Sequence, residues 1–264
     1  MSNESKPIIF IDGSYYCFHR FYSIQRWFKN AYPEIILEEP SKNEIFVEKY
    51  KKTFVENLNS IRAKLNLPEN TIIIVGKDCP RKNIWRMELY DKYKGTRDQT
   101  RTQHVGAFFE MAYGSLFQEA GVHTILYHER LECDDCIALA VKHLFSAETN
   151  ITIITSDRDY LQLATRPNIR IIDLSFKNLG EGHDFKKDLF CKIVMGDTSD
   201  NISSVLKKCG PKTALKCFEN SEYFEQRMKK EDAYAKLQLN KTLVDFECIP
   251  EVHKEEFLAK YMVG

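Results

Sequence analysis

Short isoleucine-rich runs in this chain are repeatedly followed by acidic side chains, and this pattern constrains the fold more than any other feature. The runs are 8–11, 72–75 and 151–155, and each is followed within three residues by an aspartate. Short apolar runs that do not alternate are typical of strands buried on both faces of a parallel sheet. Because sites in such sheets lie outside the carboxyl ends of the strands, we expect these acidic side chains to gather at one edge.

Nine acidic side chains follow these runs or stand in two further short motifs. They are Asp12, Asp78, Glu132, Asp134, Asp135, Asp157, Asp159, Asp197 and Asp200. Residues 132–135 are expected to open a helix, where the helix dipole favours negative charge. Nine carboxylates in one place would repel one another and protonate unless a cation neutralised them. Oxygen ligands select a hard ion such as Mg²⁺ or Mn²⁺, so the pattern indicates a metal-dependent enzyme whose substrate carries phosphates.

Helical periods alternate with strand-like runs through the first part of the chain. Apolar residues step by four and three along 54–65, 105–116 and 137–144, and two more strand-like runs occupy 122–126 and 169–173. Alternation of strand and helix is typical of an α/β domain with a parallel sheet. We therefore expect such a domain over residues 1–185.

The second part of the chain, 186–264, shows no strand pattern and is rich in lysine. Helices are expected at 188–195, 213–218 and 231–244, forming a small helical module without a large core of its own. One segment of the first part lacks a readable period. Residues 20–43 are expected to form an irregular excursion between the first strand and its helix.

The charge of the chain is balanced overall but unevenly distributed. The formal net charge is +0, which by itself argues against a nucleic-acid binder. Seven Lys/Arg against three acids lie between Arg81 and Arg101, and four lysines without an acid lie between Val205 and Cys217. Such a polarised surface suits a phosphate-rich partner. Either basic stripe, taken alone, is equally typical of a solvated helix face.

Composition excludes several other classes of protein. The chain has 264 residues, of which 43% are hydrophobic, enough for a sizeable core. It contains no apolar run near the roughly 20 residues that span a bilayer, and its first residues lack the pattern of a signal peptide. Its eight cysteines show neither a C-x-x-C pair nor zinc spacing. We expect a soluble, intracellular protein with free thiols, with cytoplasm and nucleus left open.

Five motifs, in order along the chain, resemble the flap endonuclease or 5′ nuclease family. The motifs are Phe10-Ile-Asp12-Gly13-Ser14-Tyr15 with Arg20, Trp85-Arg86 leading to Tyr93-Lys94-x-x-Arg97, Glu132-x-Asp134-Asp135-x-Ile137-Ala138, Thr155-x-Asp157-x-Asp159-x-Leu161, and Met195-Gly196-Asp197-x-Ser199-Asp200-Asn201. They are most similar to the branch that holds the 5′ nuclease domain of bacterial DNA polymerase I and the phage enzymes. The resemblance covers some four fifths of the chain. It implies a PIN-like parallel-sheet nuclease core with a helical arch and a C-terminal helix-three-turn-helix module.

The resemblance also implies a metal site built from all nine carboxylates. Two or more Mg²⁺ ions, with Mn²⁺ as an alternative, would lie among them, and a pair about 4 Å apart would activate water and stabilise the leaving oxygen. Mg²⁺ keeps several waters and takes few protein ligands. We therefore expect Glu132, Asp134, Asp157 and Asp159 to lie nearest the ions, with the others acting partly through water.

The basic segment around residues 81–102 resembles the arch or gateway of the family, through which a free 5′ end passes. By this resemblance Lys94, Arg97 and Arg86 are catalytic, because a cation beside the scissile phosphate offsets charge in the transition state. Arg20 and Arg81 would contact DNA. Tyr93 would stack on a base or, alternatively, pack as an ordinary aromatic.

Residues 201–214 resemble the helix-three-turn-helix of the family, which holds duplex DNA without reading its bases. The DNA-binding positions there would be Lys207, Lys208, Gly210, Lys212 and Thr213. This chain departs from the glycine-rich pattern, with Ser204 for one glycine, Lys208 where a second is expected, and one extra residue. Glycine allows close approach of the backbone to a phosphate or an ion. The departure leaves open whether the turn holds a K⁺ ion, while the lysines compensate electrostatically.

Together with these patterns, the resemblance implies a free-standing structure-specific 5′ nuclease, both flap endonuclease and 5′-3′ exonuclease, that leaves 5′-phosphate and 3′-hydroxyl ends in DNA replication or repair. The expected partner is branched or nicked DNA with a 5′ single strand, bound by a monomer away from any membrane. An RNA–DNA hybrid, cut by an RNA-primer-removing or mainly exonucleolytic enzyme, is the alternative within the class. A catalytically inactive DNA-binding scaffold is the alternative outside it. A sliding-clamp partner is not readable from the sequence.

Overall fold

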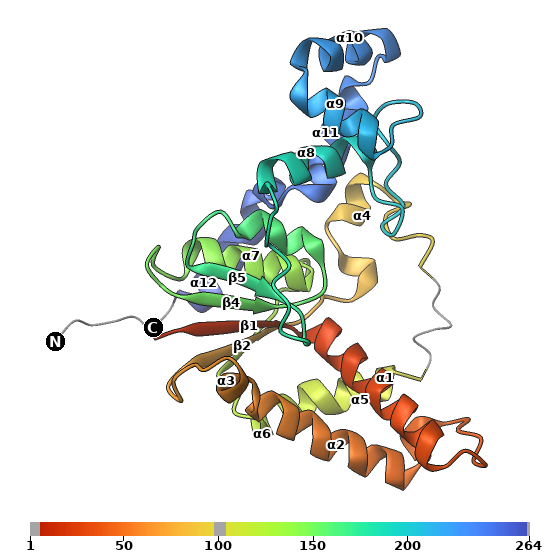
Figure 1. Cartoon of the computed structure of the whole chain (residues 1–264), viewed down its shortest axis with the longest axis vertical. Helices are drawn as coiled ribbons and strands as arrows, with labels where there is room; N and C mark the ends of the chain where they lie inside the picture. The colour runs from red at the N-terminus through yellow and green to blue at the C-terminus, as the bar shows by residue number, and fades with distance from the viewer. Residues whose placement is uncertain (1–5, 98–103, 263–264) are drawn as a thin grey trace, which may run out of the picture.

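A five-stranded parallel sheet forms the centre of the protein (Figure 1). The computed structural model describes residues 6–97 and 104–262. The strand order is β3-β2-β1-β4-β5, with β1 in the middle and Ile8 opposite both Ile72 and Ile151. The strands are β1 Ile8–Asp12, β2 Ile72–Gly76, β3 Thr124–Leu126, β4 Ile151–Ile154 and β5 Ile169–Ile172. All five strands predicted from the isoleucine-rich runs are confirmed, with ends shifted by one or two residues.

Helices cover both faces of this sheet, because alternate strand residues point to opposite sides. On one face Ile9 and Ile11 pack against α1, α2 and the helical stretch around α5. On the other face Ile8 and Phe10 pack against α7. The helices of the first face are α1 Gly13–Ala31, α2 Glu44–Asn59, α3 Ile61–Lys64, α5 Gly106–Met111, the π-helical turn η4 Ala112–Leu116 and α6 Phe117–Glu119. Those of the second face are α7 Cys133–His143 and α12 Glu251–Tyr261.

The prediction that residues 20–43 are irregular is wrong for the first half of that segment. Helix α1 runs on to Ala31, and an irregular loop with one short helical turn, η1 Pro40–Lys42, follows. Within α1, Phe21, Ile24 and Phe28 are buried on one side, and they step by three and four as a helix requires. Cationic, polar and further aromatic residues occupy most of the other positions and obscure this stripe in the sequence.

Four helices beyond the sheet form a second layer of structure, at the top of Figure 1. They are α8 Phe185–Met195, α9 Pro211–Glu219, α10 Ser221–Glu231 and α11 Tyr234–Val244. Apolar side chains from α8, α9, α10 and the connection between α8 and α9 share a small core. The predicted helix 231–244 begins only at Tyr234, because Asp232 takes a left-handed conformation (φ 48°) that ends α10.

The last part of the chain returns to the sheet. After α11, the turn η6 Phe246–Cys248 and then α12 bring Phe246, Ile249 and Phe257 into the core beneath α7. The segment 186–264 therefore contributes to three buried clusters: the small one among α8, α9 and α10, a second around Tyr93, and the large core of the sheet. The domain boundary at residue 185 stays a prediction.

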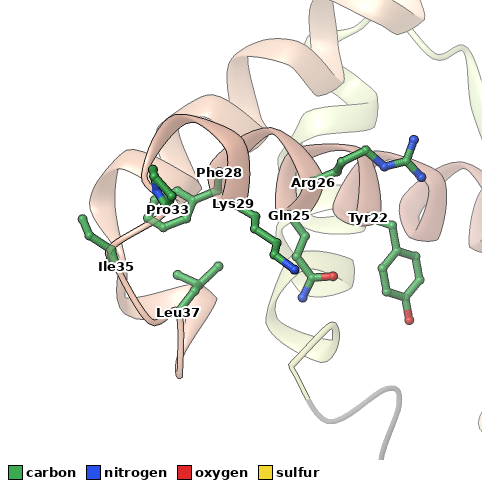
Figure 2. A pocket seen from close by; sticks show the side chains of 8 residues that line it. All are labelled: Tyr22, Gln25, Arg26, Phe28, Lys29, Pro33, Ile35 and Leu37. Atoms are coloured by element: carbon green, nitrogen blue, oxygen red, sulfur yellow. The ribbon is translucent and has the colours of Figure 1, made fainter.

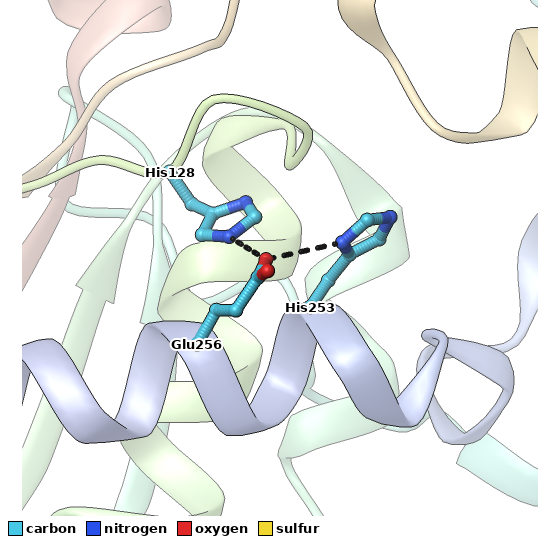
Figure 3. Close-up of side chains that lie close together, drawn as sticks. All are labelled: His128, His253 and Glu256. Carbon is cyan, nitrogen blue, oxygen red and sulfur yellow. Dashed lines mark hydrogen bonds and ion pairs between the residues drawn. The ribbon is translucent and has the colours of Figure 1, made fainter.

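A cluster of His128, His253 and Glu256 fastens α12 to the loop after β3 (Figure 3). His128 Nε2 lies 3.0 Å from Glu256 Oε2, and His253 Nδ1 lies 3.5 Å from it. The amide of Arg130 donates to His128 Nδ1 at 3.1 Å, so the neutral ring carries its proton on Nε2, directed at Glu256. A metal bound at Nε2 would need the opposite tautomer. We therefore interpret the cluster as a hydrogen-bonded helix anchor.

Two further observations concern the cysteines and the helices. All eight cysteines are free. Among the residues that the structure describes, no helix combines the length and apolarity that a bilayer crossing requires.

Candidate active site

The end of β1 and the segment after β2 place two aspartates side by side. Asp12 caps α1 by accepting from the amide of Tyr15 at 3.0 Å, and its second oxygen accepts from Thr155 Oγ1 at 3.0 Å. Asp78 accepts from the amide of Cys133 at 2.8 Å and from the Ser14 hydroxyl. Parallel strands thus deliver these carboxylates to one edge of the sheet, as their spacing predicts.

Burial is the main reason why Asp12 resists ionisation. Together with the nearby carboxylates of Asp78 and Asp157, it raises the pKa of Asp12 to about 7, against the lowering effect of its hydrogen bonds. The carboxylates that the sequence places after three different strands therefore act on one another electrostatically. An added positive charge at this edge would relieve the repulsion.

The start of α7 supplies three more carboxylates in a tight group. Ligand oxygens of Glu132, Asp134 and Asp135 lie within 4.8 Å of one another. Glu132 is the N-cap residue, and its amide donates to Asp135 at 3.2 Å. Burial, with the carboxylates of Asp135 and Glu132, raises the pKa of Asp134 well above its usual range. Asp134 is thus the member of the group that most lacks positive charge.

Arg86 lies beneath this group and neutralises two of its members. Its guanidinium donates to both oxygens of Asp135 at 2.7 Å and to Glu132 at 3.0 Å, with only 2% of the residue exposed. Trp85 Nε1 donates to Asp135 as well, at 3.0 Å. Both Asp135 oxygens are therefore engaged by side chains, and Arg86 faces the interior. The roles predicted for Asp135 as a metal ligand and for Arg86 as a catalytic residue stay predictions. Their placement favours a supporting role, in which they hold the acidic group in position.

Residues of the basic segment form ion pairs and hydrogen bonds with Glu132 and Asp200. Lys94 forms an ion pair with Glu132, and Arg97 Nη2 lies 2.7 Å from Asp200 Oδ1. The Tyr93 hydroxyl donates to Glu132 and Asp200, at 3.0 and 3.2 Å. Burial works against the charge of Lys94, but the carboxylates of Glu132 and Asp200 outweigh it and raise the Lys94 pKa above its usual value.

Tyr93 itself is buried, with 3% of its surface exposed, in a cluster that includes Cys79 and Ile84. The position of Tyr93 agrees with the alternative that it packs as an ordinary aromatic residue. Base stacking by Tyr93 stays a prediction. Arg81 Nη2 donates to the carbonyl of Lys94 at 2.6 Å and so supports the segment. Arg101 and the rest of 98–103 lie outside the described residues.

A further lysine, absent from the sequence prediction, bridges the outer carboxylates. Lys192 of α8 forms an ion pair with Asp159 and lies 2.9 Å from Asp197 Oδ2. Burial raises the pKa of Asp159 to about 6, with Lys192 opposing and Asp157 adding to the shift. Asp197 behaves oppositely: burial alone would raise its pKa, but hydrogen bonds from Ser199 and Lys192 lower it to about 2.

The carboxylates lie along the sheet edge, at the start of α7 and in the segment that follows α8. The backbone amide of Asp159 donates to the carboxylate of Asp157 at 2.9 Å. The carboxylate of Asp159 lies close enough to that of Asp200 for the two to interact electrostatically. An all-oxygen donor set with raised pKa values for Asp12, Asp134 and Asp159 suits a hard divalent cation. These carboxylates therefore fit the divalent metal ion that the sequence predicts.

The predicted DNA-binding residues occupy two other places. Lys207, Lys208 and Gly210 lie in the connection between α8 and α9, and Lys212 and Thr213 begin α9. Arg20 lies on α1, half-buried, where burial lowers its pKa from the usual value. Its Nε has no hydrogen-bond partner among the described residues.

A surface hollow of about 680 Å³ lies elsewhere, around the far half of α1 and the loop that follows (Figure 2). Its lining consists of Tyr22, Gln25, Arg26, Phe28, Lys29, Pro33, Ile35 and Leu37. None of the nine carboxylates belongs to this lining. The acidic edge of the sheet is therefore the candidate site.

Comparison with known proteins is consistent with this assignment. A 5′-3′ exonuclease of Buchnera aphidicola subsp. Schizaphis graminum is 28% identical over 224 residues, which cover 80% of this chain and 69% of that protein. A 5′-3′ exonuclease of Bacillus subtilis is 27% identical, with 62% of each chain covered. Ribonuclease H of Enterobacteria phage T4 is 24% identical over 74% of this chain and 72% of that protein.

Solved structures share the fold. A bacteriophage T5 protein co-crystallised with metal ions matches with a TM-score of 0.66 and 16% identity, over 97% of this chain and 98% of that one. The T5 flap endonuclease in a pseudo-enzyme-product complex with DNA and metal ions matches with a TM-score of 0.62 and 17% identity, over the same shares. At this identity the likeness concerns the fold, including its PIN-like sheet.

A sequence model of the family described as 5′-3′ exonuclease, N-terminal resolvase-like domain, matches residues 7–192. This range runs from the start of the sheet into α8 and contains seven of the nine carboxylates. The chain therefore belongs to the family of 5′-3′ exonucleases with an N-terminal resolvase-like domain.

Proposed function

We propose that this protein is a metal-dependent 5′ nuclease that hydrolyses phosphodiesters of DNA at the junction between a duplex and a 5′ single strand. One observation supports the proposal above all. Half-buried carboxylates with raised pKa values meet a basic segment at the carboxyl edge of a parallel sheet. An acidic group that needs cations, beside side chains that attract phosphates, suits phosphodiester hydrolysis.

Glu132, Asp134, Asp157 and Asp159 are the residues we propose as nearest to two Mg²⁺ ions, with Mn²⁺ as a substitute. When bound, such ions generate hydroxide from water and stabilise the leaving oxygen. The protein's own residues do the rest. Arg86 and Trp85 hold Asp135 in place, and this fixes the start of α7 on which Asp134 stands.

Lys94 and Arg97 are proposed to turn from their carboxylate partners to the scissile phosphate when substrate binds. Their present partners, Glu132 and Asp200, are two of the proposed members of the metal site. Where Glu132 and Asp200 held a metal, Lys94 and Arg97 would be available to the phosphate. A cation beside the phosphate stabilises the charge that develops during cleavage.

The duplex is proposed to lie on the connection between α8 and α9 and on the start of α9. Lys207, Lys208 and Lys212 there supply phosphate contacts without base reading. The protein would act as a monomer inside the cell, in DNA replication or repair. Cutting leaves a 5′-phosphate and a 3′-hydroxyl.

A labelled 5′-flap substrate tests the proposal directly. Wild-type protein should cut it only with Mg²⁺ or Mn²⁺, and Asp134→Asn should lower the rate by several orders of magnitude while flap binding is kept or tightened, because phosphate repulsion falls. Cleavage by Asp134→Asn within about threefold of wild type at saturating Mg²⁺ would remove this residue from the metal site. Binding without any cleavage by wild type would favour a DNA-binding scaffold.

RNA–DNA hybrids form a second candidate substrate class. One relative, from phage T4, carries the name Ribonuclease H, and flap, nick and hybrid cleavage can share one metal site. Rates on a 5′ flap, a nicked duplex and an RNA–DNA hybrid of the same sequence would rank these activities.

A further inference from the structure

The connection between α8 and α9 has much of its backbone paired with side chains of the same chain. We refer to residues 203–210 as the α8–α9 turn. Asn240 Nδ2 donates to the carbonyl of Ser203 at 2.9 Å. Ser204 Oγ donates to the carbonyl of Leu206 at 3.0 Å, and Arg227 Nη2 donates to the carbonyl of Lys207 at 3.0 Å. Carbonyl oxygens of this kind are what a monovalent cation needs as ligands.

Charge in and around the turn also opposes a bound cation. Lys207 and Lys208 belong to the turn, and the guanidinium of Arg227 lies against it. The carboxylate that contacts the turn, Glu231, is engaged twice: it accepts from the amide of Lys207 at 2.7 Å and from Arg227 at 2.6 Å. The residues present therefore do not fit the K⁺ ion that the family resemblance left open.

Helix α10 holds the turn in place of an ion. Arg227 and Glu231 stand one helical turn apart on α10 and grip both the carbonyl and the amide of Lys207. Beneath them Leu206 packs in the small core with Met228 of α10. The next residue, Lys208, has a left-handed backbone (φ 51°), a conformation usual for glycine. The grip on Lys207 thus fixes the place where the chain makes this unusual bend.

We propose that Arg227 takes the place of a bound monovalent cation in the α8–α9 turn, and that Arg227 and Glu231 are positioning residues for duplex DNA. They hold the backbone so that Lys207 and Lys208 face the phosphates, and do not touch DNA themselves. This inference rests on the proposed function, since it concerns how the same turn binds its duplex. Its consequence is that duplex affinity is indifferent to the identity of the monovalent cation.

The experiment measures binding of a fluorescent flap duplex by the full-length protein in EDTA, which withholds the catalytic metal. KCl, NaCl and tetramethylammonium chloride are compared at equal concentration, because the last ion is too large for a carbonyl cage. Wild-type Kd values should agree within about twofold across the three salts. Arg227→Gln should raise Kd about tenfold with an unchanged slope against salt concentration, because no phosphate contact is lost. Arg227→Lys should recover part of this loss.

Lys229→Gln is the matched control, since it removes one positive charge from the same helix at an exposed side chain that pairs with Glu225, 3.7 Å away. It should stay within about twofold of wild type. Single-turnover cleavage in Mg²⁺ at saturating enzyme should be near wild type for all these variants, which separates positioning of the duplex from chemistry. Thermal unfolding checks the fold, and Glu231→Gln tests the same grip if Arg227→Gln unfolds.

Three results would overturn the inference alone. The first is wild-type binding at least about fivefold tighter in K⁺ than in tetramethylammonium. The second is a binding defect of Arg227→Gln no larger than that of Lys229→Gln. The third is a salt slope reduced by about one unit in Arg227→Gln, which would make Arg227 a phosphate contact. Absence of duplex affinity in wild type would overturn the proposed function as well. Cation-independent, Arg227-dependent binding without flap cleavage in Mg²⁺ would support the inference and remove the nuclease proposal.

Discussion

At the scale of single residues, Glu132 is the meeting point of the site. It accepts from the guanidinium of Arg86 below and from Tyr93 above, and it pairs with Lys94. Burial opposes its ionisation, but Lys94 and Arg86 outweigh this and lower the Glu132 pKa below its usual value. One buried carboxylate thus links the start of α7 to the basic segment.

Replacing Arg86 by Met should lower the free energy of unfolding by about 3–5 kcal/mol, because Asp135 and Glu132 would then carry uncompensated buried charge. Urea unfolding measures the change. The control is Arg130→Met, whose partner Glu88 is exposed, and it should cost at most about 1 kcal/mol. If Arg86→Met unfolded like wild type but lost cleavage by orders of magnitude, a direct catalytic role would replace the supporting one.

Two lysines should divide the work between chemistry and binding. Lys94→Gln should lower the single-turnover rate about 100-fold or more with little change in duplex Kd, because its cation acts on transition-state charge. Lys212→Gln should instead weaken binding and flatten the salt dependence by about one unit of slope. Equal binding defects in both variants, with unchanged rates at saturation, would argue against a catalytic position for Lys94.

Carboxylates were easier to find in the sequence than their partners. Seven of the nine acids stand after strands or at the start of α7, and Asp197 and Asp200 stand in a short motif after α8, where neighbouring residues give each one a context. Lys192, which bridges Asp159 and Asp197, is one of many lysines on a helix, and its pattern is that of a solvated face. Only the packing of α8 against the sheet edge reveals its role.

At the scale of elements, the strands were predictable because each is a short run of mostly apolar residues that is buried on both faces of the sheet. Helix α1 beyond residue 20 was not, since aromatic, polar and cationic residues are mixed along it and its buried face is defined by α2 and α5. Helix α12 was missed for a related reason. Phe257 is its only fully buried apolar anchor in the described residues, and α7, far away in sequence, is its partner.

The left-handed bend at Lys208 can be tested as a property of the α8–α9 turn. Lys208→Gly and Lys208→Ala both remove the charge, but only glycine adopts φ near 51° without strain. Lys208→Gly should therefore be more stable than Lys208→Ala by about 1 kcal/mol, as measured by thermal or urea unfolding. Both should lose about one unit of salt slope in duplex binding. Equal stability of the two would mean that the turn does not keep this conformation in solution.

At the scale of the whole molecule, the acidic site should make stability depend on pH. The Asp12 and Asp159 pKa values are raised to about 7 and about 6, so the folded protein keeps protons that the unfolded chain has released. Between about pH 4 and pH 7 the folded state binds more protons, and stability contributed by these groups falls as pH rises.

Between pH 5 and pH 7 in EDTA, the free energy of unfolding of wild type should therefore fall by about 2 kcal/mol more than that of Asp12→Asn, as measured by urea unfolding. The exposed Glu148→Gln is the control and should follow wild type. Mg²⁺ should reduce the difference, because it stabilises the ionised carboxylates. Parallel curves for wild type and Asp12→Asn would show that Asp12 is ionised throughout this range.

The basic segment spans from α7 to the start of the helical layer, since Lys94 reaches Glu132 and Arg97 reaches Asp200. We expect a strand to enter the site by its free 5′ end beneath this segment. A protein bound at the 5′ terminus before the enzyme is added should stop cleavage, and the same block added afterwards should not. Unimpaired cutting of 5′-blocked flaps or of single-stranded circles would show an open groove.

The return of the chain to the sheet has a consequence for synthesis. Arg86 donates through Nε to the carbonyl of Leu243 at 2.8 Å, and Phe246, Ile249 and Phe257 complete the core under α7. The acidic edge is encoded early, yet its supporting arginine obtains its last partner only when almost the whole chain has left the ribosome. A nascent or prematurely ended chain therefore carries the carboxylates without the contacts that complete their support, and we expect it to lack the proposed nuclease activity until Leu243 and α12 are in place.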